Sequence, residues 1–518
     1  MKRTKQNGIT LIALVITIIV LLILAGVSIA TLTGDNGILT RAQDAKNRTE
    51  EAAEQEESDL ARLEDLINQS TNGGYIESKG VNQPYLLEGM TKIMFKLPED
   101  SSKGEVIKEG EEGFDENNWY DYNSSKWANA MTEDGSMWVW IPRFAYTLNE
   151  TNQTIDVKFL VGTTNQYYDD DGILQTASRA TSKDETIDTS SGYYVHPAFT
   201  NESSIDYVNG GWDEELTGIW VAKFEAGYTD TSNKDIEKPV FQPLAYSMNY
   251  ITINDSYNVS RNLTNSGNIY GLSSATTDSH LMKNSEWGAV AYLAWSEYET
   301  KGTEPYVNNI NVNNNISTVY AVTGLTTGST SEGQYTTTAE YLTNVKARTG
   351  NDAVNGIYAW DQEEGQKASS TLNMYGIYDL SGGLWERTAG YIANGNSNLK
   401  TYGESVAYEN GVLKTTSTKY TTVYPNTSSE DSNIDTASGQ NYPLNTKIFG
   451  DAIRETSTSG TGANSWNRDY SYFPALDGPF AIRGGDCNGG SSAGLFAFHR
   501  AYGYSYIYNG FRSVLVAL

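Results

Sequence analysis

The sequence predicts an α+β protein in which an N-terminal transmembrane helix continues into a helical stalk. Two observations predict the N-terminal part: residues 9–33 carry no charged side chain, and apolar residues recur every three to four positions along 34–70. A third observation predicts the remainder. From Tyr75 onward, short apolar or aromatic runs alternate with Gly, Asn, Asp and Ser, which is typical of short strands joined by turns with few helices between them.

The uncharged run at 9–33 is long enough to cross a bilayer core as a helix. Lys2, Arg3 and Lys5 precede it, so the positive-inside rule keeps the N-terminus in the cytoplasm and the bulk of the chain outside. A cleaved secretory signal fits less well, because the run is longer than a usual signal core and has no clear cleavage site at its end. The sequence therefore predicts a single-pass protein of the bacterial cell membrane with an extracellular C-terminal domain.

The first eight residues resemble a leader. The phrase Lys5-Gln6-Asn7-Gly8, followed by the apolar Ile9-Thr10-Leu11-Ile12, resembles the start of type IV pilins and pseudopilins. The resemblance implies cleavage between Gly8 and Ile9, with prepilin peptidase and pilus subunits as partners. Residue 13 departs from the pattern: Ala13 stands where the family has a glutamate that pairs with a neighbouring subunit, which weakens the expectation of polymerisation.

Residues 34–70 are predicted to form the stalk, because Asp35 and Asn36 can cap a helix there. Its recurring apolar positions are Ile38, Ala42, Ala45, Ala52, Leu60, Leu63 and Ile67. Residues 71–82 are interpreted as a linker, and 83–518 as one domain.

Within that domain the sequence predicts strands at 137–144 and 218–225, and a helix at 285–297 with helical spacing of apolar residues. Two stretches rich in Ser, Thr, Asn and Gly, at 307–338 and 394–462, are typical of long surface insertions.

Composition excludes several classes of function. The formal charge of −28 argues against a nucleic-acid partner, which requires a basic surface. Cys487 is the only cysteine, so intrachain disulfides and cysteine-based zinc sites are excluded, and three scattered histidines argue against a histidine-rich metal site. The run Asp169-Asp170-Asp171-Gly172 offers oxygen ligands for calcium, but without EF-hand spacing an Asx-type turn is the better interpretation. We expect no metal and no cofactor.

The segment 486–509 has the composition of a binding surface. It is rich in Tyr, Gly, Ser and Asn and contains no Lys, Glu, Gln, Met or Trp. Tyrosine supplies broad, stiff contact area, while Ser, Gly and Asn supply adaptable hydrogen bonds, as in antibody-like paratopes. An alternative explains the spacing alone: Tyr502, Tyr504, Tyr506 and Tyr508 would alternate because they share one face of a β-strand.

Four phrases in order carry a family resemblance. They are Ser285-Glu286-Trp287, then 375–386 (YGIYDLSGGLWE), then Arg483-Gly484-Gly485, then Gly510-Phe511-Arg512. Together they resemble the formylglycine-generating-enzyme subgroup of the C-type lectin fold, which implies that fold over 83–518. From the residues themselves, Gly382 and Gly383 suit tight turns, Trp287 and Trp385 suit a core, and Arg483 and Arg512 suit multidentate bridges between loops.

The resemblance offers two branches. The enzyme branch oxidises a substrate cysteine with a pair of its own cysteines, and this chain lacks the pair, so we expect no enzymatic activity and no catalytic residues. The second branch fits better: an RGG phrase, a Tyr- and Ser-rich stretch and a closing GFRSVLV are similar to the variable proteins of diversity-generating retroelements. In that family, error-prone copying at adenines exchanges asparagine-type codons for a restricted set of residues.

This second resemblance implies a variable region at 483–518 that binds an unknown protein or glycan ligand on another cell or on phage. The positions that match diversified ones, and therefore the expected ligand-binding residues, are Asp486, Cys487, Asn488, Ser492, His499, Ala501, Tyr502, Tyr504, Tyr506, Ile507, Tyr508 and Asn509. The expected function is that of a cell-surface receptor or adhesin. A fixed pilin-like adhesin or minor pilin and a formylglycine-generating-type oxidase remain as alternatives.

Overall fold

The structure is a computed structural model in which two compact units, Met1–Thr71 and Asn72–Leu518, are each described by themselves. The residues described are 15–24, 45–46, 48–49, 74–96, 104–180, 187–201, 210–228, 235–243, 245–296, 298–300, 302–305, 320–322, 357–361, 363, 365–427, 429–445, 449–486, 489 and 492–518.

In the first unit, the prediction of a transmembrane helix at 9–33 is wrong, and with it the single-pass membrane localisation. No helix among the described residues is long and apolar enough to cross a membrane. The expected cleavage site at Gly8 and Ile9 lies outside the described residues, as does all of the stalk except helical residues 45–46 and 48–49.

The second unit is α+β, as predicted, and its largest element is an antiparallel sheet. In spatial order its seven strands are β15 (Thr277–Leu281), β25 (Ser513–Ala517), β12 (Gly218–Ala222), β6 (Met137–Pro142), β5 (Asn129–Met131), β3 (Thr91–Lys96) and β4 (Glu105–Lys108). The predicted strands near 137–144 and 218–225 are therefore confirmed, and they pair directly, with Trp140 opposite Trp220. Both of these strands are buried along their whole length, which explains their unbroken apolar character.

A second, five-stranded sheet carries the C-terminal residues. Its members are β21 (Thr422–Tyr424), β18 (Trp385–Ile392), β22 (Phe480–Arg483), β23 (Phe498–Ala501) and β24 (Asn509–Phe511). β18 runs antiparallel to β22 and parallel to both β21 and β24. A three-stranded sheet is formed by β11 (Tyr194–Val195), β7 (Phe144–Asn149) and β8 (Thr154–Phe159).

Short hairpins and helices complete the unit. The two-stranded pairs are β1 (Tyr75–Ile76) with β2 (Val81–Asn82), β9 (Gln166–Tyr168) with β10 (Leu174–Thr176), β13 (Gly227–Tyr228) with β14 (Tyr246–Ser247), β16 (Tyr320–Val322) with β17 (Ile357–Ala359), and β19 (Tyr408–Glu409) with β20 (Val412–Leu413). The α-helices are α3 (Ile253–Arg261), α4 (Asn284–Trp295), α6 (Ser397–Ala407) and α7 (Ile434–Leu444). The 3₁₀ turns are η1 (Glu116–Asn118), η2 (Tyr122–Ser124), η3 (Pro197–Phe199), η5 (Gly365–Ala368) and η6 (Trp466–Arg468).

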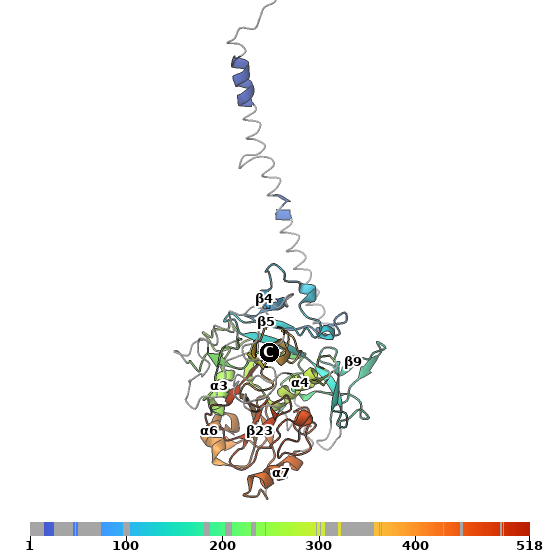
Figure 1. The fold of residues 1–518 in the computed structure, drawn as a ribbon, viewed down its shortest axis with the longest axis vertical. Coiled ribbons are helices and arrows are strands. Elements are labelled where there is room, and N and C mark those ends of the chain that lie inside the picture. The colour runs from blue at the N-terminus through green and yellow to red at the C-terminus, as the bar shows by residue number, and fades with distance from the viewer. Residues whose placement is uncertain are drawn as a thin grey trace, which may run out of the picture. The chain divides into compact units, whose positions relative to one another are not determined.

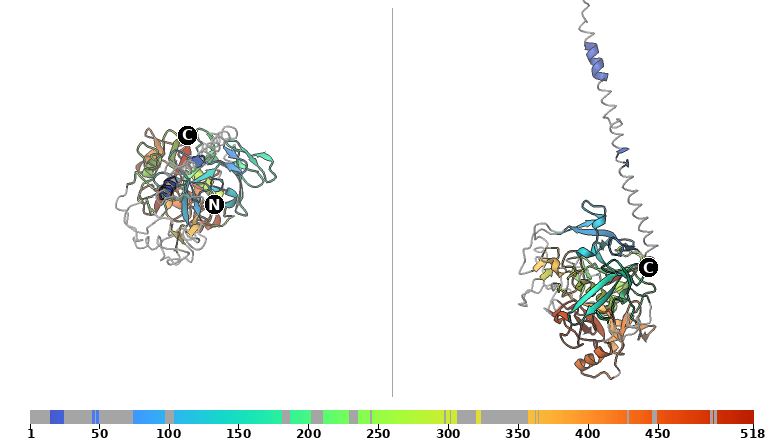
Figure 2. Two further views of the ribbon diagram at one scale, coloured as in Figure 1. Left: turned by 90° about the horizontal axis from the view of Figure 1, so that it is seen from above. Right: turned by 90° about the vertical axis from the view of Figure 1, so that its right-hand side faces the viewer.

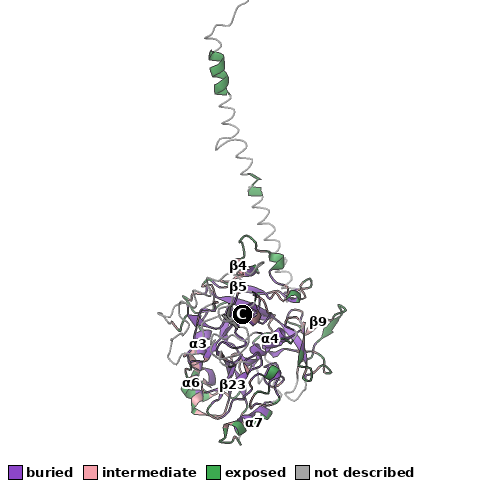
Figure 3. Ribbon diagram, in the orientation of Figure 1, coloured by how far each residue is buried: buried purple, intermediate pink, exposed green. Residues whose placement is uncertain are grey.

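The predicted helix at 285–297 is confirmed as α4, and every one of its residues is buried. Figure 3 shows this helix in the buried colour, together with much of the region around β5. Trp287 on α4 donates from Nε1 to the Leu495 carbonyl at 2.8 Å. The helix thus connects the core to the C-terminal segment that contains the expected binding residues.

Two stretches differ from the sequence interpretation. Residues 71–82, expected as a linker, contribute the β1–β2 hairpin. The stretch 394–462, expected as a surface insertion, contributes β21 to the second sheet and buries Leu399, Tyr424 and Ile453. Its polar composition concealed these contacts, because the buried apolar residues are widely spaced. Most of 307–338 lies outside the described residues.

Several elements of the C-terminal third of the chain gather at one end of this unit, whereas β25 lies within the seven-stranded sheet. In Figure 1 α6, α7 and β23 lie together, and the orange and red segments occupy the same end in the right-hand view of Figure 2. Two buried arginines from the motif phrases bind elements there, as the sequence predicted. Arg483 donates to the carbonyls of Asp451 and Ala452, each at 3.0 Å. Arg512 forms a bidentate pair with Glu386, at 3.0 and 2.5 Å.

Candidate ligand-binding site

A cavity of about 570 Å³ lies between the second sheet and the segment that joins β23 to β24. Eight of the twelve expected binding residues line it: Asp486, His499, Ala501, Tyr502, Tyr504, Tyr506, Tyr508 and Asn509. Ser492 and Ile507 do not line it, and Ile507 is buried. Cys487 and Asn488 lie outside the described residues. Residues selected by composition and motif therefore converge on one concave surface.

The alternating tyrosines do not share a strand face. β23 ends at Ala501 and β24 begins at Asn509, and the segment 502–508 between them, here called the tyrosine loop, contains no strand. Successive tyrosine rings nevertheless touch. Tyr502 stacks on Tyr504 with centroids 5.4 Å apart, and edge contacts follow at 6.0 Å to Tyr506 and 5.6 Å to Tyr508. Loop geometry, not strand alternation, thus produces a continuous row of rings.

Main-chain carbonyls hold the tyrosine loop in place. Donors outside the loop reach five of its carbonyl oxygens: Ile253 N–H to Gly503 (3.0 Å), Arg387 Nη2 to Tyr504 (2.5 Å), Tyr250 N–H to Tyr506 (3.2 Å), Asn249 Nδ2 to Ile507 (3.1 Å) and Trp385 N–H to Tyr508 (2.8 Å). Every residue type offers the same carbonyl, so these bonds do not depend on which side chains the loop carries. The path of the loop is thereby separated from the identity of its side chains.

Gly503 is a fixed point of this loop. Its φ is +96°, in the left-handed region that glycine adopts readily. A Cβ there would lie 2.6 Å from Cε2 of Phe480 and 3.0 Å from Cβ of Tyr402. Its carbonyl also accepts from Ile253 at the start of α3, where the first N–H groups of a helix lack intrahelical partners.

Arg387 lies beneath the loop and is buried. Burial lowers the pKa of its guanidinium to about 9, a shift that the negative field of Asp255 partly opposes. Its Nη2 bonds to the Tyr504 carbonyl, while Nε and Nη1 have no hydrogen-bond partner among the described residues. Burying a charged group that makes so few hydrogen bonds costs free energy of folding. Arg387 therefore positions the tyrosine loop more than it stabilises the fold.

His499 lines the same cavity and belongs to a second aromatic group. Its ring stacks on Tyr470 and Tyr472, with centroids 5.1 and 5.3 Å apart, and contacts Trp385 at 5.6 Å. Burial lowers the pKa of its imidazole to about 4, which outweighs the opposing hydrogen bond between Nδ1 and the Arg500 carbonyl at 2.6 Å. His499 is therefore neutral near pH 7, and this part of the surface presents aromatic faces without added charge.

The structure adds residues that the sequence did not select. Trp385, Ile482, Arg500 and Gly503 also line the cavity. Trp385 was expected in the core, yet it is only half-buried and borders the cavity. Arg500 is held by Asp477 at 3.1 Å and lies over the Tyr502 ring at 5.1 Å. No sequence signal distinguished these residues, because their role depends on pairing between β18, β22 and β23.

No family model and no curated protein matches this chain. The resemblance of its motifs to a known fold family thus remains a prediction, and the site is interpreted from its geometry.

Within the described part of the chain, no group of three or more His, Cys, Asp or Glu side chains is placed to hold a metal ion. Asp169, the first residue of the acidic run, instead closes a turn: its Oδ1 accepts from the N–H groups of Asp171 and Ile173, at 3.1 and 2.8 Å. This is the Asx-type turn that the sequence favoured.

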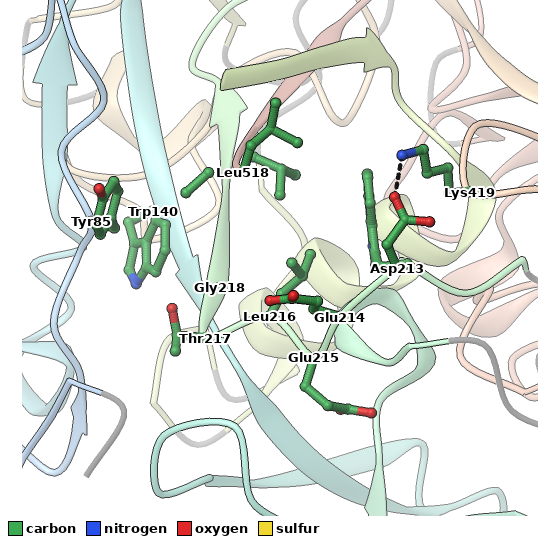
Figure 4. Close-up of a pocket in the computed structure, with 13 residues that line it drawn as sticks. Tyr85, Trp140, Asp213, Glu214, Glu215, Leu216, Thr217, Gly218, Lys419 and Leu518 are labelled. Atoms are coloured by element: carbon green, nitrogen blue, oxygen red, sulfur yellow. Dashed lines mark hydrogen bonds and ion pairs between the residues drawn. The ribbon is translucent and has the colours of Figure 1, made fainter. Parts of the chain in front are cut away.

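A smaller cavity of about 310 Å³ lies beside strands β6, β12 and β25 of the seven-stranded sheet (Figure 4). Its wall is mostly apolar, with Trp140, Leu216 and Leu518 around the opening, while the Asp213 carboxylate is paired with Lys419. None of the residues expected from the sequence lines it. We therefore place the candidate site at the tyrosine loop.

Proposed function

We propose that this chain is a ligand-binding protein whose C-terminal region, 483–518, is diversified by a retroelement. The observation that carries the proposal is the main-chain attachment of the tyrosine loop, in which five carbonyls of 503–508 accept from donors outside it. A binding surface whose residues change needs a backbone that does not depend on them. The restricted residue alphabet of 486–509 is the second support.

The tyrosines are placed to supply most of the binding energy. Tyr504 and Tyr506 are 38% and 43% exposed, whereas Ala501, Ile507 and Asn509 are buried. Partly exposed rings that already contact one another lose little conformational freedom on binding, and tyrosine is enriched among residues that dominate interfaces. The ligand is a protein or glycan surface that covers this row, and substitution of the rings would select another ligand.

The distribution of sequence variation tests the proposal. The locus and its flanks are sequenced across many cells of one population, and a near-copy of the segment encoding 483–518 is sought beside a reverse-transcriptase gene. We expect such a copy, with substitutions confined to its adenines and falling on positions such as Tyr502, Tyr504 and Tyr506. Absence of a copy together with invariance of 486–509 would refute diversification and leave a fixed adhesin.

A second measurement tests the physical basis. Tyr502, Tyr504, Tyr506 and Tyr508 are replaced together by serine in the full chain. The free energy of unfolding should fall by no more than about 2 kcal/mol, because the carbonyl bonds remain and the removed rings are partly exposed. Failure of this variant to fold would show that the side chains specify the loop, which contradicts the proposal.

A further inference from the structure

A third cavity, of about 470 Å³, lies away from the tyrosine loop and shares no lining residue with the site described above. Five parts of the chain form it: the β1–β2 hairpin, the η2 turn, the end of β8, the β9–β10 turn and Tyr298, which follows α4. The volume is within the range of small-molecule sites. The contacts of its wall decide which class of molecule it fits.

One wall is aromatic. The Tyr75 and Tyr168 rings lie with centroids 6.0 Å apart and planes inclined by 31°, and Tyr168 is 38% exposed. Phe159, which also lines the cavity, contacts both Tyr122, at 5.4 Å, and Tyr298, at 4.9 Å. The Tyr168 ring therefore offers an accessible aromatic surface in a cavity lined by further aromatic rings.

Polar groups that line the same cavity have spare hydrogen-bonding capacity. Within the described part of the chain, no hydrogen bond or ion pair engages the side chains of Glu77 and Asn123, which are both exposed at the cavity. The Asp170 side chain is 92% exposed, and Lys158 contacts it through Oδ1 at 2.7 Å, which leaves Oδ2 available. A carboxylate accepts hydrogen bonds, and an amide both donates and accepts them.

The charges of the wall argue against an ionic ligand. Lys79 donates to the carbonyls of Asn117 and Tyr120, at 2.5 and 3.0 Å, and Lys158 is paired with Asp170. An anionic ligand would be repelled by the carboxylates of the wall, and both ammonium groups are already engaged. A cationic ligand would be repelled by those two ammonium groups. The cavity thus combines a flat aromatic face with acceptors and an amide, and neither sign of charge dominates.

We propose that this cavity binds a neutral polyhydroxylated ring, namely one saccharide residue of a glycan. The apolar face of the ring would lie on Tyr168, and its hydroxyl groups would donate to Glu77 and exchange hydrogen bonds with Asn123. Stacking and directional hydrogen bonds together match the two halves of the wall. The site is independent of the tyrosine loop and would persist if that loop were changed.

Saturation-transfer NMR on the full chain tests this site with methyl glycosides of glucose, galactose and mannose and with N-acetylglucosamine. We expect transfer to at least one of them, reduced at least fivefold by Tyr168→Ala and lowered by Glu77→Gln. Tyr85→Ala, which removes a 42% exposed ring outside this cavity, is the matched control and should leave the signal unchanged. Thermal unfolding of each variant checks that the fold is retained, and Asn123→Ala replaces Tyr168→Ala if that variant does not fold.

Three outcomes would overturn the proposal. The first is that none of the four sugars shows transfer. The second is that transfer is lost in Tyr85→Ala and kept in Tyr168→Ala. The third is that a cationic probe, N-acetyl-arginine amide, binds through Tyr168 while the sugars do not.

Discussion

The buried guanidinium of Arg387 donates from Nη2 to the main-chain carbonyl of Tyr504 at 2.5 Å. The Tyr504 side chain, by contrast, is 38% exposed and lines the cavity, so it is available to a ligand. One residue of the loop thus has its backbone held by the core and its ring offered to solvent. This division between fixed backbone and available side chain is the central property of the candidate site.

Removing the guanidinium should loosen the loop without unfolding the protein. In Arg387→Met, amide hydrogen exchange across 503–508 should accelerate about tenfold, the equivalent of one lost hydrogen bond of about 1.4 kcal/mol. Tyr504→Ser is the matched control, because it keeps the carbonyl and removes only the ring, and it should leave exchange unchanged. Equal exchange rates in Arg387→Met and the unmodified protein would show that the bond does not hold the loop.

Gly503 should tolerate no side chain. Gly503→Ala combines a φ of +96° with a Cβ 2.6 Å from Phe480, so we expect a loss of about 2 to 4 kcal/mol in the free energy of unfolding. Gly411→Ala is the control: its φ is +78°, but no atom lies within 4 Å of a Cβ there, so only backbone strain of about 1 kcal/mol applies. Urea unfolding of both variants measures the difference, and similar losses would show that the contact with Phe480 relaxes freely.

The Arg512–Glu386 pair should be essential to the second sheet. Both side chains are buried, and Arg512 also donates to the carbonyls of Ala222 and Tyr378, at 2.6 and 2.7 Å. Arg512→Met leaves the Glu386 carboxylate buried without its partner, which should cost about 3 to 5 kcal/mol in chemical denaturation. The double variant Arg512→Met/Glu386→Leu removes the stranded charge and should recover part of that loss. A double variant that is less stable than the single one would contradict this explanation.

Glu455 should make stability depend on pH. Burial raises the pKa of its carboxyl to about 7, although the hydroxyls of Tyr146 and Tyr292 donate to it and oppose the shift. Between about pH 4.5 and 7 the Glu455 carboxyl is therefore protonated in the folded state and ionised in the unfolded state. This contribution to stability is complete below about pH 4.5 and is lost as the pH rises through 7.

Glu455→Gln removes this titration. Between pH 5 and pH 8 the unmodified protein should lose roughly 2 kcal/mol more stability than Glu455→Gln, as measured by urea unfolding at each pH. Tyr146 and Tyr292 remain in both proteins, so their contacts with the residue are matched. Parallel stability curves for the two proteins would show that Glu455 does not titrate in this range.

Local patterns were sufficient for several elements. The unbroken apolar runs at 137–142 and 218–222 and the helical spacing at 284–295 predicted β6, β12 and α4, because burial on all sides requires apolar residues throughout. The arginines of the RGG and GFR phrases make the expected multidentate hydrogen bonds: Arg483 reaches the loop at 451–452, whereas Arg512 binds chiefly to β18 and β12. The prediction of a membrane helix was wrong. The uncharged run at 9–33 is long enough to span a bilayer, but no described helix is long and apolar enough to cross a membrane.

By itself, the sequence determined the α+β class and the buried strands and helix, because composition and periodicity record burial. The residue set that gathers at the candidate site came from the resemblance of its motifs to a known family. Only the tertiary structure decided how that set is presented. In the structure the tyrosines lie on a loop and not on a strand face, and Trp385 lies at the cavity edge and not in the core. Arg387 lies under Tyr504. These features arise from pairing between segments more than a hundred residues apart, and no local pattern of residues encodes such a contact.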